Sequence, residues 1–393
     1  MKKQISQKIF LSSFLLMFAC EKNEIENLSA QNISNQVAIS TDQSLNELST
    51  SNFLKGKTLK LDFNADELRK EYSKPQTQWP KATIDEGINF VEIGSIKTVR
   101  YPQNNRYTKT KYDLGRMLFS ESKLSKTGSM SCFSCHNQNM SWADGLEKSM
   151  GIDAMLLKRN SPSIVNSAFH ETLFWDSRAK SLEEQAKMVL LNVREMDSSE
   201  ELVKKNLSDS PLYTNLFKQA FGNSEINLDK ISQAISTFER TIVTKNNSSF
   251  DKFVLGDKTA LNDSQVRGLH IFRTAGRCIN CHSGTNFTDN KMHNIGLVLE
   301  GTKHEDTGKF DLTKKDADFG LFRTPSLRNV ANTAPYFHNG LIPNLKGLLN
   351  VYNNGFPSSK NKSPHIRPIG LEPQDREDLK AFIEALSEKV EVR

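Results

Sequence analysis

Cysteine is scarce in this sequence, with 5 among 393 residues, and long apolar runs are almost absent. With 52 basic and 46 acidic residues neither sign of charge dominates, so nothing suggests nucleic acid as a partner. The chain has neither a phosphate-binding loop nor a dinucleotide fingerprint, which argues against a nucleotide-dependent enzyme. A hydrophobic share of 37% with 20 glycines and 12 prolines excludes collagen-like, disordered and multi-span membrane proteins.

One short apolar stretch stands at the start of the chain. Three lysines precede the run from Ile9 to Ala19, which is too short to span a bilayer and is typical of a secretory signal. The run ends at Cys20 in a context that resembles a lipoprotein processing site; an incidental cysteine after an ordinary signal is the alternative. We expect a signal peptide over 1–19, lipidation at Cys20, and a flexible tether over 20–50. The protein is then a membrane-anchored, periplasmic lipoprotein of a Gram-negative bacterium.

The other four cysteines fall into two identical patterns. The patterns are Cys132-Phe-Ser-Cys135-His136 and Cys278-Ile-Asn-Cys281-His282. C-x-x-C-H is the signature of c-type haem attachment, in which both thiols bond to the haem vinyl groups and the histidine ligates the iron. Redox dithiols, disulfides and a split zinc site are the alternatives, but a dithiol does not require the histidine, and zinc pairs lie closer together. The sequence therefore predicts two covalently attached haem c groups.

Apolar residues at three-to-four spacing predict helices around these motifs. The predicted helices cover residues 113–121, 181–192, 228–242, 261–273 and a segment after Pro373. The fold class is therefore mainly α, with two cytochrome c-like haem domains. We place these domains at 100–255 and 256–393, after an extension over 51–99 that shows no clear period.

Several further segments, in order, resemble the bacterial di-haem cytochrome c peroxidases and their relative MauG. The segments are Leu114-Gly-Arg-Met-Leu-Phe119, Arg159-Asn-Ser-Pro162, Phe174-Trp-Asp176, Glu195-Met196, Thr324-Pro-Ser-Leu-Arg-Asn329 and Thr333-Ala-Pro-Tyr-Phe-His-Asn-Gly340. The resemblance covers about residues 112–387. It implies that hydrogen peroxide is reduced at the first haem, with electrons that pass through the second haem from a small periplasmic donor such as cytochrome c.

The resemblance also implies roles for single residues near the first haem. Glu195 matches the catalytic glutamate, Gln185 its neighbour in the pocket, and Trp175 the tryptophan between the haems; a solvated carboxylate and a core tryptophan are the plain alternatives. Ile152 stands where some members carry a histidine that blocks the iron, so we expect an open iron. Met150 or Met155 as a ligand is the alternative. Asn160, Thr333 and Pro335 match the family's calcium ligands.

The second haem is expected to have an unusual partner. Tyr352 stands where most of these peroxidases carry a methionine ligand, and tyrosine is the residue that MauG uses there. A phenolate should lower the reduction potential of the haem relative to methionine. His338, His293 or solvent at the iron are the alternatives. Three functions follow, in order of preference: a peroxidase, a MauG-type oxidase of residues in a partner protein, and a non-catalytic electron carrier. A homodimer stays open.

Overall fold

The computed structural model describes Leu59 and residues 61–392, which belong to one compact unit. The predicted signal, the tether and Cys20 lie outside the described residues. None of the helices in the described part has the length and apolar character that a bilayer crossing requires.

The described chain is mainly helical, which confirms the predicted fold class. Its helices are α2 Ala65–Tyr72, α3 Lys109–Phe119, α4 Leu182–Leu191, α5 Glu200–Ser208, α6 Pro211–Phe221, α7 Leu228–Glu239, α8 Ser249–Val254, α9 Asp263–Arg273, α10 Phe310–Thr313, α11 Leu345–Asn354 and α12 Pro373–Glu384. Two short strands, β1 Met292–His293 and β2 Phe322–Arg323, pair antiparallel. Short 3-10 turns form both cysteine motifs, at Cys132–Ser134 and Cys278–Asn280.

The ends of the helices follow local capping. Asn262 caps α9 through a reciprocal pair of hydrogen bonds with Gln265. The helix before the first motif begins earlier than predicted, because the Thr108 side chain accepts a hydrogen bond from the Lys111 amide and caps α3. In α4 the Ser181 hydroxyl accepts from the N3 amide, so the predicted start is confirmed.

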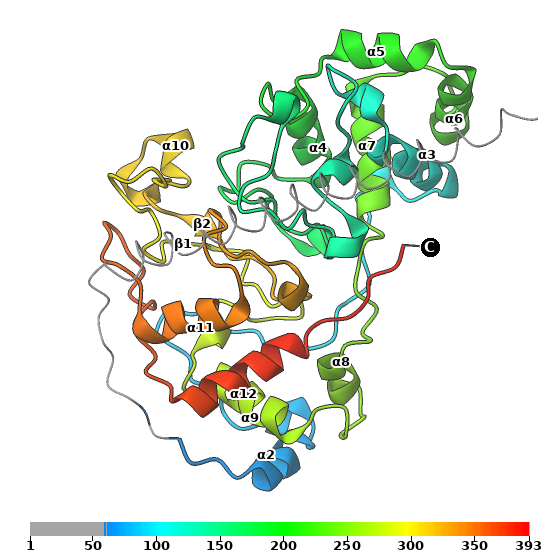
Figure 1. Cartoon of the computed structure of the whole chain (residues 1–393). Coiled ribbons are helices and arrows are strands. Elements are labelled where there is room, and N and C mark those ends of the chain that lie inside the picture. Colours follow the sequence, from blue (N-terminus) through cyan, green and yellow to red (C-terminus); the bar gives the residue numbers. More distant parts are fainter. Residues whose placement is uncertain (1–58, 60, 393) are drawn as a thin grey trace, which may run out of the picture. The chain divides into compact units, whose positions relative to one another are not determined.

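Two groups of helices, one around each motif, carry the fold (Figure 1). In the first group α7 packs on α3 and α4, and in the second α9 packs on α12 and α2. Each group contains one very close helix crossing at a glycine. A Cβ atom on Gly115 of α3 would lie 1.9 Å from the Ala234 oxygen of α7, and one on Gly268 of α9 would lie 1.9 Å from the Asp378 oxygen of α12. Both helix groups therefore contain the same close approach of two helices, which a side chain larger than that of glycine would prevent.

The segment that the sequence left unassigned packs along the second motif. Its helix α2 contacts α9, and the chain after it reaches the Cys278–Asn280 turn. There the Asn280 side chain accepts from the Asp85 amide at 2.8 Å and donates to the Thr83 oxygen at 3.1 Å. The Gly284 amide donates to the Val91 oxygen at 2.8 Å. The described part of the extension thus belongs structurally to the second haem motif.

Candidate active site

A cavity at the first motif brings together the residues that the sequence singles out. It is lined by Cys132, Cys135, His136, Trp175, Gln185 and Glu195, among others. They come from the motif turn, from the loop before α4, from α4 itself and from the segment after it. Residues far apart in the sequence therefore share one pocket.

The donor groups of both motifs fit c-type haem. His136 Nδ1 lies 3.1 Å from the Trp142 oxygen and His282 Nδ1 lies 3.0 Å from the Phe287 oxygen, which fixes each ring and leaves Nε2 for a metal. Burial lowers the pKa of both histidines and so favours the neutral, ligating imidazole. None of the four motif cysteines forms a disulfide. Burial raises the pKa of Cys135 to about 12, which is opposite to a reactive redox dithiol.

Glu195 lies in this cavity in a state suited to proton exchange. Burial raises its pKa to about 7, while Arg178 and a hydrogen bond from Asn192 limit the rise. The Asn192 amide donates to Glu195 Oε1 at 3.0 Å and holds the carboxyl group in place. A carboxyl group with a pKa near 7 can both accept and return a proton at neutral pH.

The loop after the first motif is attached to the same segment. The Ile152 amide donates to the Glu195 oxygen at 3.1 Å, and the Ile152 side chain is buried without lining the cavity. Met150 lines the cavity, whereas Met155 does not. Of the two methionines considered as ligands, only Met150 therefore faces the first motif.

Trp175 lines both the first cavity and a second cavity at the other motif. Its Nε1 donates to the Asn160 oxygen at 3.0 Å, and its ring lies edge-on to His338 with 6.3 Å between ring centroids. The Asn160 amide in turn donates to the His338 oxygen at 2.8 Å. Trp175 thus stands where the two cavities meet. The calcium role of Asn160, Thr333 and Pro335 stays a prediction.

The second cavity contains the motif together with all three candidate partners for its iron. Tyr352, His338 and His293 line it with Cys278, Cys281 and His282. His338 stacks on Phe322 at 3.7 Å between ring centroids, and His293 is hydrogen-bonded to Asp289. The Tyr352 hydroxyl has no hydrogen bond to any of the described residues, and burial followed by the nearby thiols raises its pKa above the ordinary value. It is therefore available to a ligand in the cavity.

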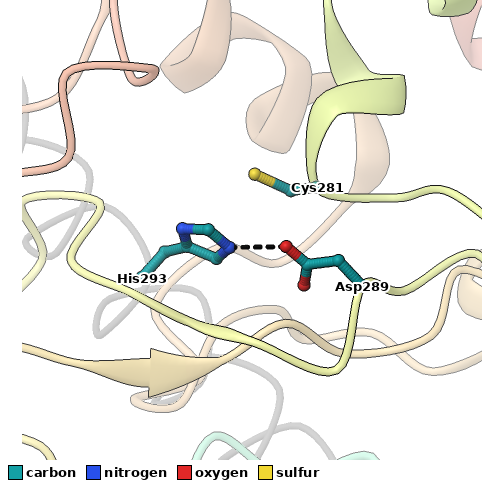
Figure 2. Close-up of side chains that lie close together, drawn as sticks. All are labelled: Cys281, Asp289 and His293. Atoms are coloured by element: carbon teal, nitrogen blue, oxygen red, sulfur yellow. Dashed lines mark hydrogen bonds and ion pairs between the residues drawn. The ribbon is translucent and has the colours of Figure 1, made fainter. Parts of the chain in front are cut away.

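Figure 2 shows a compact group beside this motif, formed by Cys281, Asp289 and His293. One potential ligand atom from each lies within 4.8 Å of the others. Burial alone would lower the pKa of His293, but hydrogen bonds to Asp289 and to Cys281 raise it to about 10. Because Cys281 is one of the two motif thiols, the group belongs to the haem motif and is not a separate metal site.

Comparison with known proteins decides the family. Residues 109–259 match the family described as di-haem cytochrome c peroxidase. The chain is 36% identical over 291 residues to the methylamine utilization protein MauG of Methylorubrum extorquens, which covers 74% of this chain and 82% of that protein. The chain belongs to the di-haem cytochrome c peroxidase family. This confirms the resemblance found in the sequence and makes the protein an oxidoreductase of the peroxidase class with haem as its cofactor.

Two further relatives show the breadth of this family. Cytochrome c551 peroxidase of Nitrosomonas europaea is 40% identical over 229 residues, with 58% of this chain and 68% of that protein covered. Among solved structures, a MauG-like protein associated with microbial copper homeostasis is 31% identical with a TM-score of 0.69. That match covers 74% of this chain and 93% of the other.

Three charged residues at the cavities of this family member were missed from the sequence. Arg178 lines the first cavity, stacks 3.4 Å from the centroid of the Phe174 ring and lowers the pKa of Glu195. Glu239 lines the same cavity, and burial raises its pKa to about 8. Its position four residues after Ile235, on the apolar stripe of α7, is a signal that could have revealed it. Arg323 lines both cavities and carries no such signal.

Proposed function

We propose that this protein reduces hydrogen peroxide to water at the first cavity, with electrons that enter at the second cavity from a small periplasmic donor such as cytochrome c. The observation that carries the proposal is the meeting of Glu195, Gln185 and the first motif in one cavity, with the pKa of Glu195 raised to about 7 by burial. This is the chemistry that an acid–base group beside a peroxide site needs.

Both haems are held covalently in this proposal. Thioether bonds would form at Cys132 and Cys135 in the first cavity and at Cys278 and Cys281 in the second, with His136 and His282 as the iron ligands. Haem held in the first cavity would supply a redox-active iron for the reaction with peroxide.

Glu195 moves the proton. Its carboxylate takes the proton from one peroxide oxygen and returns it to the other, so that water can leave. The hydrogen bond from Asn192 keeps the carboxyl group in one orientation, and Arg178 prevents its pKa from rising further. Gln185 lines the same cavity and orients peroxide. Trp175 relays electrons, because its indole lines both cavities.

The test uses the fully ferric, haem-loaded protein with hydrogen peroxide and reduced cytochrome c. We expect turnover without prior reduction, since no histidine stands at position 152 to block the first iron. Glu195→Gln should lower turnover by about 10²–10⁴-fold. Glu201→Gln, an exposed glutamate at the start of α5, is the control and should change nothing. Unchanged turnover in Glu195→Gln would contradict the proposal, and a fully low-spin ferric protein would favour a simple electron carrier.

Tyr352 favours a second candidate, the oxidation of residues in a partner protein as in MauG. The tyrosine lines the second cavity with a free hydroxyl, and as an iron ligand it would lower the potential of the haem. If peroxide changes both haem spectra while reduced cytochrome c stays reduced, this function is preferred. Modified residues in a protein that co-purifies would then identify the substrate.

Export completes the proposal. We infer a periplasmic lipoprotein anchored through lipid on Cys20, and labelling of the wild type but not of Cys20→Ser with a fatty-acid probe tests it.

Calcium bound by Asn160, Thr333 and Pro335 is proposed as a structural ion. Metal analysis of the purified protein before and after chelation measures it.

A further inference from the structure

Four arginines are buried in the described part of the chain, and one of them differs from the rest. The four are Arg240, Arg273, Arg323 and Arg328. Three of them form ion pairs with carboxylates: Arg240 with Glu183, Arg273 with Glu92, and Arg328 with Asp251. Arg323 is 4% exposed and has no carboxylate partner among the described residues. A buried cation without an anion is costly, so this exception requires an explanation.

The hydrogen bonds of Arg323 leave part of its guanidinium group unused. Nη1 donates to His170 Nδ1 at 2.9 Å and to the backbone oxygen of Thr324 at 3.2 Å. Nε donates to the Phe174 oxygen at 3.3 Å. Nη2 has no hydrogen-bond partner among the described residues. His170 offers no negative charge, because burial and then Arg323 lower its pKa to about 3 and keep it neutral.

The position of Arg323 indicates which kind of anion could pair with its guanidinium group. Arg323 lines both cavities, and its backbone amide donates to the Trp175 oxygen at 2.8 Å. No aspartate or glutamate of the described chain lines the second cavity. Burial lowers the pKa of Arg323 to about 10, so the group still carries its charge at neutral pH. Because no carboxylate of the described chain forms an ion pair with Arg323, an anionic ligand that enters a cavity could supply the missing negative charge.

We infer that Arg323 binds a propionate carboxylate of haem where the two cavities meet. The propionates are the anionic substituents of haem c, since its thioether links are neutral, and a guanidinium fork matches a carboxylate in shape and charge. The inference rests on haem occupying the cavities, as proposed above. Because Arg323 also binds Trp175 through its backbone, it connects the propionate to the residue shared by both cavities.

The experiment compares Arg323→Gln with Arg323→Lys and with Arg376→Gln, a less buried arginine that lines the second cavity. Covalent haem content is measured first, and the reduction potential of each haem is then titrated spectroelectrochemically at several pH values. Loss of the cation in Arg323→Gln should lower the potential of one haem and make it depend on pH where the freed propionate titrates. Arg323→Lys should shift the potential less, and Arg376→Gln should leave both potentials near wild type.

Two results would overturn the inference. One is full haem content in Arg323→Gln with both potentials unchanged, and the other is a larger shift in Arg376→Gln. If Arg323→Gln fails to fold, the propionate bending bands in resonance Raman spectra of Arg323→Lys decide: they should move, because lysine lacks the bidentate fork, and unmoved bands refute the contact. None of these readouts depends on peroxide turnover, so a failure of the proposed peroxidase function would be recognised separately.

Discussion

The two cavities are alike at the cysteine motif and different in their other lining residues. In each, a 3-10 turn carries the cysteines, the motif histidine faces a backbone oxygen at 3.0–3.1 Å, and a glycine crossing supports the preceding helix. Outside the motif, the carboxyl groups of Glu195 and Glu239 line the first cavity, whereas no carboxylate of the described chain lines the second. The common motif fits a cofactor shared by both cavities, and the other lining residues give each cavity a different chemistry.

The difference follows from charge and burial. A raised carboxyl pKa in the first cavity provides a group for proton transfer, and the phenol of Tyr352 in the second provides a candidate ligand in a cavity without a carboxyl group of the described chain. We therefore expect peroxide chemistry in the first cavity only, and electron storage or entry in the second.

The largest expected effect comes from removing one motif at a time. Cys132→Ser with Cys135→Ser, and separately Cys278→Ser with Cys281→Ser, should each reduce covalent haem from two groups to one. Both double variants should lose peroxide turnover almost completely, because one cavity binds peroxide and the other supplies electrons. The pyridine haemochrome spectrum after denaturation measures the haem that remains. Turnover that survives in the second double variant would show that electrons reach the first haem directly.

A smaller effect is expected from exchanging the tyrosine of the second cavity. Tyr352→Met should raise the potential of the second haem by a fraction of the roughly 0.8 V range that axial ligands span. Tyr336→Phe is the control, because Tyr336 lines the same cavity but its hydroxyl donates to the Val330 oxygen at 3.1 Å. Spectroelectrochemical titration compares the two. If both variants keep the wild-type potential, Tyr352 is packing and His338 becomes the candidate ligand.

The pH profile tests the first cavity alone. Burial raises the pKa of Glu195 to about 7, so the carboxylate that accepts the proton is lost as pH falls below 7. The second-order rate constant for peroxide should therefore rise with pH up to about 7 and then level off, with a tenfold change per unit on the acidic side. In Glu195→Gln the residual rate should not follow this curve. A wild-type profile that is flat from pH 5 to 8 would exclude Glu195 as the base.

Sequence reasoning succeeded where short-range pattern determines structure. The five-residue motifs and the apolar stripe of α7 both depend on short-range spacing and were predicted. It failed where the role of a residue depends on contacts with residues that are distant in the sequence. Arg323 is informative only because no carboxylate pairs with it in space, and the extension over 61–99 shows no clear period because most of it is irregular chain held by contacts with residues distant in the sequence. The roles of Glu195 and Tyr352 came from resemblance, which periodicity alone could not provide.

The smallest expected effect concerns that extension, which contacts the second motif at the position before its second cysteine. Asn280→Ala removes three part-buried hydrogen bonds, to the Asp85 amide, the Thr83 oxygen and the Arg277 oxygen, and should cost about 1–3 kcal/mol in all. The equivalent residue of the first motif is Ser134, which is exposed, so Ser134→Ala should change the free energy of unfolding by less than about 0.5 kcal/mol. Denaturant unfolding of the haem-loaded protein, followed by haem absorbance, measures both variants. Equal effects would mean that the extension does not stabilise the second half. The two motifs would then differ only in the other residues that line their cavities.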